Sequence, residues 1–553
     1  MKILFRNFPE IKREKFSNEE SYNKAVSMQS RQINSYKKRV RIILITVISL
    51  AVLAVLSLLV FGAVKLVNRL SAPKSDFNVR DTVLNKRSVN PKKVKLYGDE
   101  EIKISGTLTV CIDPGHGGEE PGETLEDSEG TIIRSEKIDN MELGLLLQEK
   151  LESFGVTVIM TRTGDTRHTN QERCELANQS NADLFVSLHR NNEVSDTSKK
   201  GVDIYVPSKK LDFSDVSYQT GEYILQYLDA SGISQNYGTH VGSITSEQYD
   251  FQMNRDTNMP SLVIELGYIS NEEDNLLYDL NKERYASAIA YGILKQFAPE
   301  CISQMTEPGG HIRKNNLIFD YSSLSEEDIT YAIASSDKTD FNHYVSEIRN
   351  FEDAYGGFAS EFIIDSTENE VYLTFDTGSD AGYVREILDI LDKKSVKALF
   401  FINYTFAANH PDLIREMIAK GHTIGNGSKD FPESGFSSMT EKEQKEQVFD
   451  LHEYVLFHYN YCMSLFRFPN GHFSPKSLAM VNNYQYISIF WSYSYNDYTA
   501  LGFTEEDVLN SMVDAIQSGI IYDLRTDSEM DLNVLSSFID SVYDKDYKIG
   551  LLY

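Results

Sequence analysis

Two histidines and a glutamate stand in or just after short β-type runs, where α/β enzymes carry metal ligands. The run of residues 107–112 leads into a glycine-rich turn that holds His116, and the run of residues 184–188 ends in His189. A third run contains Glu265. Two imidazoles and a carboxylate fit the three-ligand pattern of catalytic zinc, with a fourth position open for water. Because each residue alone is more often structural, the hypothesis depends on their combination.

Alternating β-type and helical patterns would position these residues. Apolar residues recur at nearly helical spacing through residues 138–154, and Gly155 ends that pattern. Residues 156–160 and 262–266 again have β-type patterns, and residues 285–297 form a predicted closing helix. This alternation predicts an α/β layered domain with a mostly parallel sheet.

A second alternation follows a less regular region, residues 302–369. This second alternation includes three further predicted strands, at residues 371–375, 398–402 and 487–491. Three helical patterns accompany them, at residues 384–391, 412–420 and 441–457. The chain is therefore expected to hold two α/β units in succession.

One uncharged run of 23 residues, 42–64, lies between two basic segments. As a helix it is long enough to cross the roughly 30 Å hydrocarbon core of a membrane. Residues 1–41 and 65–96 each carry a net charge of +7, and the basic cluster at 37–41 favours a cytoplasmic N-terminus. A cleaved signal peptide is one alternative, but its apolar core usually has only about 7–15 residues. A buried core helix is another, and the basic flanks argue against it.

The rest of the chain is strongly acidic. The 553 residues have a formal charge of −28, so residues 97–553 carry −42. An acidic surface repels phosphate, which argues against nucleic acid as a partner. The four cysteines include no C-x-x-C pair and are predicted to be structural thiols, namely Cys111, Cys174, Cys301 and Cys462.

Four stretches in order carry a family resemblance across residues 107–297. They are TVCIDPGHGG, SEKIDNMELG, DLFVSLHRN and MPSLVIELGYISN. Together they resemble the zinc-dependent N-acetylmuramoyl-L-alanine amidases of bacterial cell walls. The resemblance implies one Zn²⁺ held by His116, Glu136 and His189. It also implies that Glu265 is the catalytic residue, which takes a proton from water and returns it to the departing amine.

Neighbouring residues have expected roles of lower specificity. Asp113 is expected to shape the turn or to hold His116 from behind. Arg255 and Asn191 are candidate substrate-binding residues, although Arg255 also fits a solvated surface charge. Arg190 stands where the family usually carries a small residue, so it is expected to place a cation near the site and to shift substrate preference.

Residues 370–553 resemble the polysaccharide deacetylases, in particular the muramic-acid deacetylases that prepare the δ-lactam of spore cortex. Six stretches carry this resemblance: VYLTFDTGSDAGY, KALFFINYTF, GHTIGNGSKDFP, FRFPNGHFS, ISIFWSYSYNDY and GIIYDLRTDS. The family fold implied is a distorted (β/α) barrel whose βα loops carry the chemistry. Asp376 matches the catalytic base, and Arg467 and Asp497 match further site residues.

The metal ligands of that family are missing from this chain. Its two metal-binding histidines fall at Gly427 and Phe431, Thr377 stands at a metal-binding aspartate, and the late histidine aligns with Arg525. His422 and His472 lie nearby in sequence, but neither has a ligand position. The second domain is therefore expected to be catalytically silent, because no divalent ion would polarise an acetyl carbonyl. One prediction is a glycan-binding groove lined by Arg467, Trp491, Tyr493 and Tyr495. The alternative is that the aromatic rings simply pack in the barrel.

The sequence thus predicts an α/β protein of six segments. These are a cytoplasmic basic segment (1–41), a transmembrane helix (42–64), a stalk (65–106), a zinc amidase domain (107–299), an irregular linker (300–369) and an inactive deacetylase-like domain (370–553). The predicted place is the cell membrane, single-pass, with the N-terminus cytoplasmic and the catalytic domains outside, where peptidoglycan is the partner. A protein activator is left open.

Three functions compete at this point. The first is a membrane-tethered zinc amidase that cleaves the bond between N-acetylmuramic acid and L-alanine. The second is a bifunctional amidase and deacetylase in muramic δ-lactam formation, against which Gly427 and Phe431 argue. The third is a non-hydrolytic wall-binding protein, against which the intact set of His116, Glu136, His189 and Glu265 argues.

Overall fold

The computed structural model describes residues 104–242, 251–302, 309–310, 314–331, 341–430, 435–494 and 502–552. The predicted membrane helix 42–64, the segment 1–41 and nearly all of the stalk 65–106 lie outside these residues. No helix in the described ranges has the length and apolar character that crossing a bilayer requires. Residues Lys86–Tyr553 form one compact unit, which contains both predicted α/β regions.

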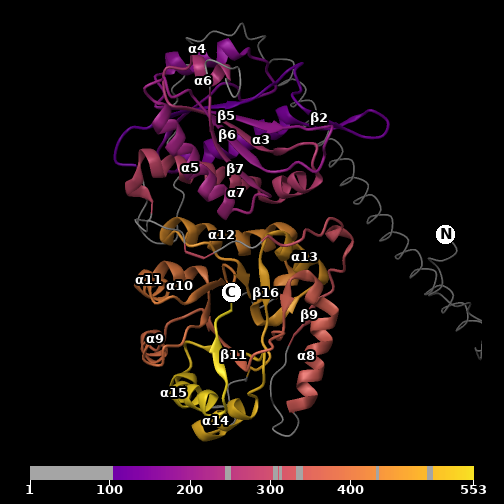
Figure 1. The fold of residues 1–553 in the computed structure, drawn as a ribbon, viewed down its shortest axis with the longest axis vertical. Coiled ribbons are helices and arrows are strands. Elements are labelled where there is room, and N and C mark those ends of the chain that lie inside the picture. The colour runs from indigo at the N-terminus through magenta and orange to yellow at the C-terminus, as the bar shows by residue number, and fades with distance from the viewer. Residues whose placement is uncertain are drawn as a thin grey trace, which may run out of the picture. The chain divides into compact units, whose positions relative to one another are not determined.

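The first α/β region is built on a six-stranded sheet in the order β4-β1-β5-β8-β6-β7. Its strands are β1 (Thr109–Pro114), β4 (Thr157–Met160), β5 (Leu184–Asn191), β6 (Val202–Val206), β7 (Asn236–Val241) and β8 (Ser261–Tyr268). Neighbouring strands run parallel except that β6 is antiparallel to β8. The expected mostly parallel sheet is therefore confirmed, and Figure 1 shows it between two groups of helices.

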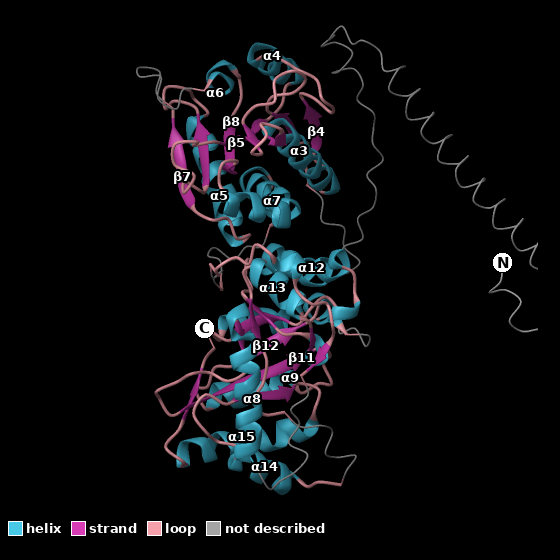
Figure 2. Ribbon diagram, turned by 90° about the vertical axis from the view of Figure 1, so that its right-hand side faces the viewer, coloured by secondary structure: helices cyan, strands magenta, loops and turns pink. Residues whose placement is uncertain are grey.

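The two faces of this sheet have different cores. One face packs into a large apolar cluster with α3 (Glu136–Ser153), α5 (Ser214–Ala230) and α7 (Glu272–Phe297). The other face packs into a smaller cluster beneath α4 (Asn170–Ser180) and α6 (Gln252–Asp256). Strand β8 shows the alternation, because Leu262 and Ile264 belong to the large cluster and Val263 to the small one. Figure 2 shows α3, α5 and α7 gathered on one side of the strands.

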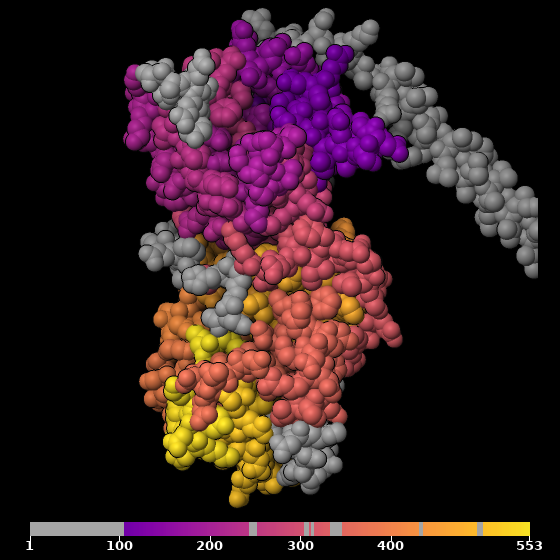
Figure 3. Space-filling model, turned by 45° about the vertical axis from the view of Figure 1, so that its right-hand side comes forward, coloured from indigo at the N-terminus to yellow at the C-terminus, as the bar shows by residue number. Residues whose placement is uncertain are grey.

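Helix boundaries differ from the expected ones where the chain enters a helix. α3 begins at Glu136, two residues before the predicted start, and follows a hairpin of β2 (Thr124–Glu126) and β3 (Ile132–Ser135). That hairpin belongs to the indigo part that projects from the surface in Figure 3. α7 begins at Glu272, well before the predicted helix 285–297, because Asn271 caps it and three acidic residues follow.

The second α/β region is a parallel sheet in the order β10-β16-β14-β13-β12-β11-β17, with β18 also paired to β11. The strands are β10 (Ser360–Glu361), β11 (Glu370–Thr377), β12 (Leu399–Ile402), β13 (Thr423–Asn426), β14 (Leu465–Phe466), β16 (Ile487–Ile489), β17 (Ile521–Arg525) and β18 (Lys548–Gly550). A bridge between Tyr493 and Tyr522 links the chain after β16 to β17. The chain beyond β16 thus reaches β17 at the far edge of the sheet, which curves as a half-barrel.

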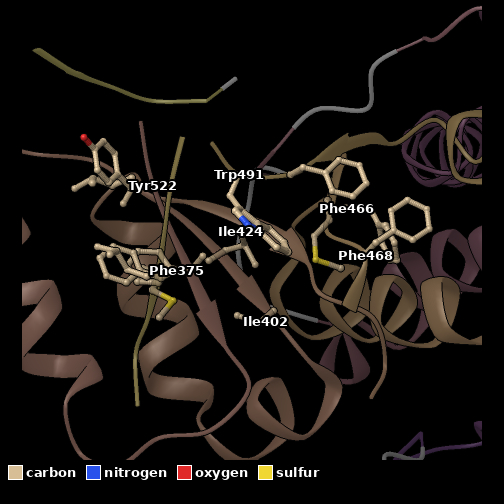
Figure 4. Close-up of a cluster of buried hydrophobic side chains, with 14 of the residues drawn as sticks. Phe375, Ile402, Ile424, Phe466, Phe468, Trp491 and Tyr522 are labelled. Atoms are coloured by element: carbon tan, nitrogen blue, oxygen red, sulfur yellow. The ribbon is translucent and has the colours of Figure 1, made fainter. Parts of the chain in front are cut away.

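Eight helices surround this sheet in the described residues. They are α8 (Phe341–Tyr355), α9 (Val384–Lys393), α10 (Tyr404–Asn409), α11 (Pro411–Ala419), α12 (Glu441–Tyr459), α13 (Pro475–Asn483), α14 (Glu505–Asp514) and α15 (Glu529–Asp544). The region expected to be irregular contributes α8, β10 and the short strand β9 (Ile329–Thr330), which pairs with β15 (His472–Phe473) from the later part of the chain. Tyr331, Ile348 and Phe362 from it join the same core as Phe375, Ile424 and Trp491, part of which Figure 4 shows.

Helix α12 contributes to the core of the first region. Phe457 lies 5.2 Å from Phe154 and 4.9 Å from Tyr291 between ring centroids, and Leu456 and Cys462 join the same apolar cluster. All four cysteines are buried and unpaired, which confirms that they are structural thiols. The two α/β regions thus share part of one hydrophobic core.

We predict that Phe457→Ala destabilises the first region. Truncating a buried phenylalanine typically costs about 3–5 kcal/mol, because it removes apolar contacts and leaves a cavity. The midpoint of thermal unfolding should fall by about 6 °C or more in differential scanning calorimetry of the full chain. Phe319→Ala, at a side chain that is 48% exposed, is the matched control and should change the midpoint little. Equal midpoints for both variants would show that α12 adds nothing to this core.

Candidate functional site

Three elements deliver the two histidines and the glutamate to one place. His116 lies in the turn after β1, Glu136 is the first residue of α3, and His189 lies near the end of β5. His116 Nε2 is 3.1 Å from Glu136 Oε2, and His189 Nδ1 is 2.9 Å from Glu136 Oε1. The three candidate ligand atoms lie within 4.8 Å of one another. Two imidazole nitrogens and one carboxylate oxygen at this spacing suit a single divalent ion.

Glu136 is the most constrained member of the site, with a side chain only 1% exposed. Its carboxylate also accepts hydrogen bonds from Asn140 Nδ2 (3.1 Å) and from the backbone N–H groups of Glu123 (2.9 Å) and Arg190 (3.0 Å). Burial alone would raise the pKa of Glu136, but the hydrogen bonds and charges of His116 and His189 lower it far below its usual value. The group is therefore held as a carboxylate, which is the form that binds metal.

A buried chain of hydrogen bonds supports His189. Its Nε2 is 3.1 Å from Ser187 Oγ, and Ser187 Oγ donates to Asp113 Oδ2 at 2.7 Å. Burial lowers the pKa of His189, but the hydrogen bond and charge of Glu136 raise it, with a result of about 9. A carboxylate that orients a ligand histidine is the usual outer support of a metal site.

Of the two roles expected for Asp113, the contacts support the first, which is to shape the turn. Asp113 makes no direct contact with the His116 ring, but accepts from Thr161 Oγ1 (2.5 Å) and Arg173 Nη1 (2.6 Å). Arg173 in turn donates from Nη2 to the backbone oxygen of His116 at 2.9 Å. Asp113 therefore fixes the turn through Arg173 and supports His189 through Ser187.

Two glycines allow the ligands to approach one another. A Cβ on Gly115 would lie 2.3 Å from His189 Cε1, and a Cβ on Gly122 would lie 2.5 Å from Glu136 Oε2. His116 itself has a φ of 63°, a left-handed conformation that costs about 1 kcal/mol or more in a residue with a side chain. The turn is therefore shaped for the position of the His116 ring rather than for local stability.

Glu265 lies beside the ligands on the same face of the sheet. It is directly opposite His189 in the register of β5 and β8, and paired residues on neighbouring strands point to one face. Burial raises the pKa of its carboxyl to about 7. A carboxyl that titrates near neutral pH is suited to accept and return a proton.

The expected role of Arg190 is wrong. Its guanidinium does not enter the site, because Nη1 pairs with Asp139 Oδ2 at 2.6 Å and Nη2 donates to Asn275 at 2.9 Å. The side chain is buried against the ring of Tyr278. Arg190 donates its backbone N–H to Glu136, and its charge is neutralised by Asp139 inside the core.

The candidate substrate residues are placed less tightly. Arg255 lies exposed on α6, with Nε 3.3 Å from Asp256 Oδ1. Asn191 ends β5, and its side-chain oxygen accepts from the N–H of Asn192 at 2.8 Å. Neither contact joins these side chains to the metal-type cluster, which consists of His116, Glu136 and His189. Their roles stay predictions.

One pair near the site was missed from the sequence. Asp203 on β6 is directly opposite Glu265 on β8, and His240 Nε2 lies 2.7 Å from Asp203 Oδ1. Burial raises the pKa of Asp203, although His240 opposes this shift. No spacing joins residues 203 and 240 in the sequence, and only the antiparallel placement of β6 brings Asp203 to Glu265.

The second region holds a remnant of a different site. Arg467, which is 2% exposed, pairs from Nη1 with Asp376 Oδ1 (3.1 Å) and with Asp523 Oδ1 (2.7 Å). Its Nη2 also donates to Thr374 Oγ1 at 2.9 Å. Burial and the neighbouring Asp376 raise the pKa of Asp523 to about 8. Asp523 was not predicted from the sequence. It forms an ion pair with Arg467, which would otherwise pair with Asp376 alone.

The described residues around Asp376 offer no cluster of metal ligands. Gly427 has no side chain, Thr377 is buried with its hydroxyl on the oxygen of Phe375, and Arg525 is directly opposite Asp376. His422 precedes β13, at the opposite end of that strand from Gly427. His472 pairs with Asp328 at 2.8 Å. Phe431, Tyr495 and Asp497 lie outside the described residues.

The predicted aromatic groove is wrong for the two rings that the structure describes. Trp491 is buried in the core shown in Figure 4, with its ring 5.4 Å from that of Tyr331. Tyr493 is also buried, and its hydroxyl donates to Ser511 Oγ at 3.0 Å. The packing alternative is correct, because neither ring has a face to offer a sugar.

Comparison with known proteins finds two family models. An N-acetylmuramoyl-L-alanine amidase model matches residues 110–295, and a polysaccharide deacetylase model matches residues 364–489. Both resemblances read from the sequence are thereby confirmed at the level of the family.

Three relatives illustrate the match. An uncharacterised 30.6 kDa protein of Geobacillus stearothermophilus is 30% identical over 199 residues, which are 35% of this chain and 72% of that protein. The peptidoglycan-N-acetylmuramic acid deacetylase PdaA of Bacillus subtilis is 28% identical over 188 residues, 34% of this chain and 71% of PdaA. The probable cell wall amidase LytH of Staphylococcus saprophyticus is 31% identical over 193 residues, 34% of this chain and 58% of LytH.

We predict that Gly115→Ala weakens Zn²⁺ binding by about 10–100-fold, the usual effect of disturbing the support of a metal ligand. The added methyl group would displace the His189 ring from Glu136. Competition of the purified chain against a chromophoric chelator measures the affinity. Gly106→Ala is the control, because a Cβ there meets nothing within 4 Å. Unchanged affinity in Gly115→Ala would mean that His189 does not hold the ion.

Proposed function

We propose that this chain, whose residues 110–295 belong to the N-acetylmuramoyl-L-alanine amidase family, is a zinc-dependent peptidoglycan hydrolase. It cleaves the amide between the lactyl group of N-acetylmuramic acid and the L-alanine of the stem peptide. The observation that carries the proposal is the convergence of His116, Glu136 and His189 within 4.8 Å, with Glu265 beside them.

The donor set fits zinc. His116, Glu136 and His189 offer two imidazole nitrogens and one carboxylate oxygen, which matches catalytic zinc sites that keep one position for water or substrate. When bound, zinc supplies a Lewis acid for the scissile carbonyl and lowers the pKa of water. The buried Asp113 and Ser187 hold His189 with Nδ1 toward Glu136, so the orientation of this ligand is set before any ion arrives.

Glu265 performs the proton transfers in this proposal. It takes a proton from the attacking water and delivers it to the amine nitrogen as the amide bond breaks, so that the carboxylate is regenerated. Its raised pKa of about 7 supports both halves of this exchange, because a carboxyl with that value is neither too weak a base nor too weak an acid.

We propose that the protein acts at the outer face of the cell membrane. The uncharged run 42–64 would anchor it, and the basic cluster at residues 37–41 supports a cytoplasmic N-terminus. Peptidoglycan, the partner in this proposal, lies on the other side of that membrane. The acidic charge of residues 97–553 gives no general attraction to an anionic wall, so recognition depends on the site itself.

The deacetylase-like domain is catalytically silent in this proposal. Gly427 and Phe431, which replace the two metal-binding histidines, cannot hold a metal, and Arg467 is bound by two carboxylates in the core. The domain instead stabilises the amidase domain, to whose core α12 contributes Phe457. This division of roles disfavours a bifunctional enzyme.

We predict that Glu265→Gln lowers the release of stem peptides from purified peptidoglycan by about 10²–10⁴-fold, the usual contribution of a general acid–base residue. Zinc content, measured by atomic emission on the same sample, should stay at one ion per chain, because Glu265 is not a ligand. Asn191→Ala is the companion variant and should lose far less activity. Undiminished release by Glu265→Gln would remove the residue from the mechanism.

We predict that the full chain with Glu265→Gln releases no acetate from peptidoglycan in the presence of Zn²⁺ or Co²⁺. The substitution isolates the second domain, since it blocks the amidase reaction without touching residues 370–553. Mass spectrometry of the muropeptides reads the loss of acetate directly in the digest. Measurable deacetylation would reverse the assignment of a silent domain.

A further inference from the structure

Arg284 on α7 lies where that helix meets α12, and its charge is buried. Its side chain is 2% exposed, and its guanidinium donates from Nη2 to His452 Nε2 at 3.0 Å and from Nη1 to Asn281 Oδ1 at 3.3 Å. The ring of Phe449 lies 4.6 Å away, measured from the ring centroid to Arg284 Cζ. No aspartate or glutamate of the described residues forms an ion pair with this guanidinium.

The titratable groups around Arg284 are neutral at physiological pH. Burial and the charge of Arg284 lower the pKa of His452 well below its usual value. Burial raises the pKa of the Cys462 thiol to about 12 and raises that of the Tyr486 hydroxyl as well. An arginine cannot lose its proton in a protein, so this guanidinium keeps a positive charge to which no carboxylate of the described residues is bonded.

One buried donor of Arg284 lacks an acceptor. Its Nε is shielded from solvent and forms no hydrogen bond within the described residues, whereas the Asn281 side chain also has a hydrogen bond with Tyr285. Asn281 is fully buried. Two other buried guanidinium groups are paired with carboxylates, Arg190 with Asp139 and Arg467 with Asp376 and Asp523. The buried Arg162 instead donates to four backbone oxygens, so its donors are satisfied. Buried charges in proteins are normally paired, so Arg284 requires a different explanation.

We propose that the junction of α7 and α12 binds one small monovalent anion, for which chloride is the physiological example. The anion accepts from Arg284 Nε and neutralises the guanidinium. Its place at the contact between the two α/β regions makes it a structural ion that stabilises their association. This site is separate from the metal-type cluster and does not depend on the amidase reaction.

The test compares thermal unfolding of the full chain in sodium chloride and in sodium gluconate at equal ionic strength. An anion held by the folded state stabilises it by mass action, so the wild-type midpoint should be higher by about 3 °C or more in chloride at about 0.2 M. Asn281→Asp supplies a carboxylate 3.3 Å from the guanidinium. In gluconate this variant should have a higher midpoint of thermal unfolding than the wild type. Chloride should not raise that midpoint further.

A second measurement does not depend on the variant. Crystals soaked in sodium bromide should show an anomalous peak within hydrogen-bond distance of Arg284 Nε. Arg385→Met, at an exposed arginine, controls for general salt effects and should respond to chloride as the wild type does. Equal chloride responses of the wild type and Asn281→Asp, or a bromide map without a peak at Arg284, would overturn the proposal.

Discussion

The whole site depends on one buried carboxylate. Glu136 accepts hydrogen bonds from two backbone N–H groups and from Asn140, and it faces both imidazoles. It can do so because it is the first residue of α3, where the exposed N–H groups of a helix favour negative charge. If α3 began one turn later, the carboxylate would leave the position between β1 and β5, and the histidines would have no common partner.

Side chains along the strands alternate strictly between the two faces of the sheet, and one of these faces surrounds that carboxylate. On β5, Leu184 and Val186 face the large core, while Phe185 faces the small one and His189 continues the latter face. Glu265 and Asp203 share this face because their strands are paired in register. A shift of β8 by one residue would turn Glu265 into the large apolar core, so the register that builds the core also builds the site.

The ligands could be predicted from the sequence because strand ends and a glycine-rich turn leave a local pattern, and a family resemblance supplied Glu136. The supports could not. Arg173, Ser187 and Asp203 reach the site only through the fold, and no spacing marks them. Arg190 shows the opposite error, since a cation beside a ligand looks functional until its pairing with Asp139 is seen. In the second region, Trp491 looked like a sugar platform because burial cannot be read from one residue.

The most direct measurement is X-ray absorption at the zinc K-edge on the purified full chain, combined with anomalous diffraction at the same edge. The account predicts one zinc per chain, with two imidazole nitrogens and one carboxylate oxygen at about 2.0–2.2 Å from His116, Glu136 and His189. A chain that takes up no zinc, or whose zinc lies away from these three residues, would contradict it.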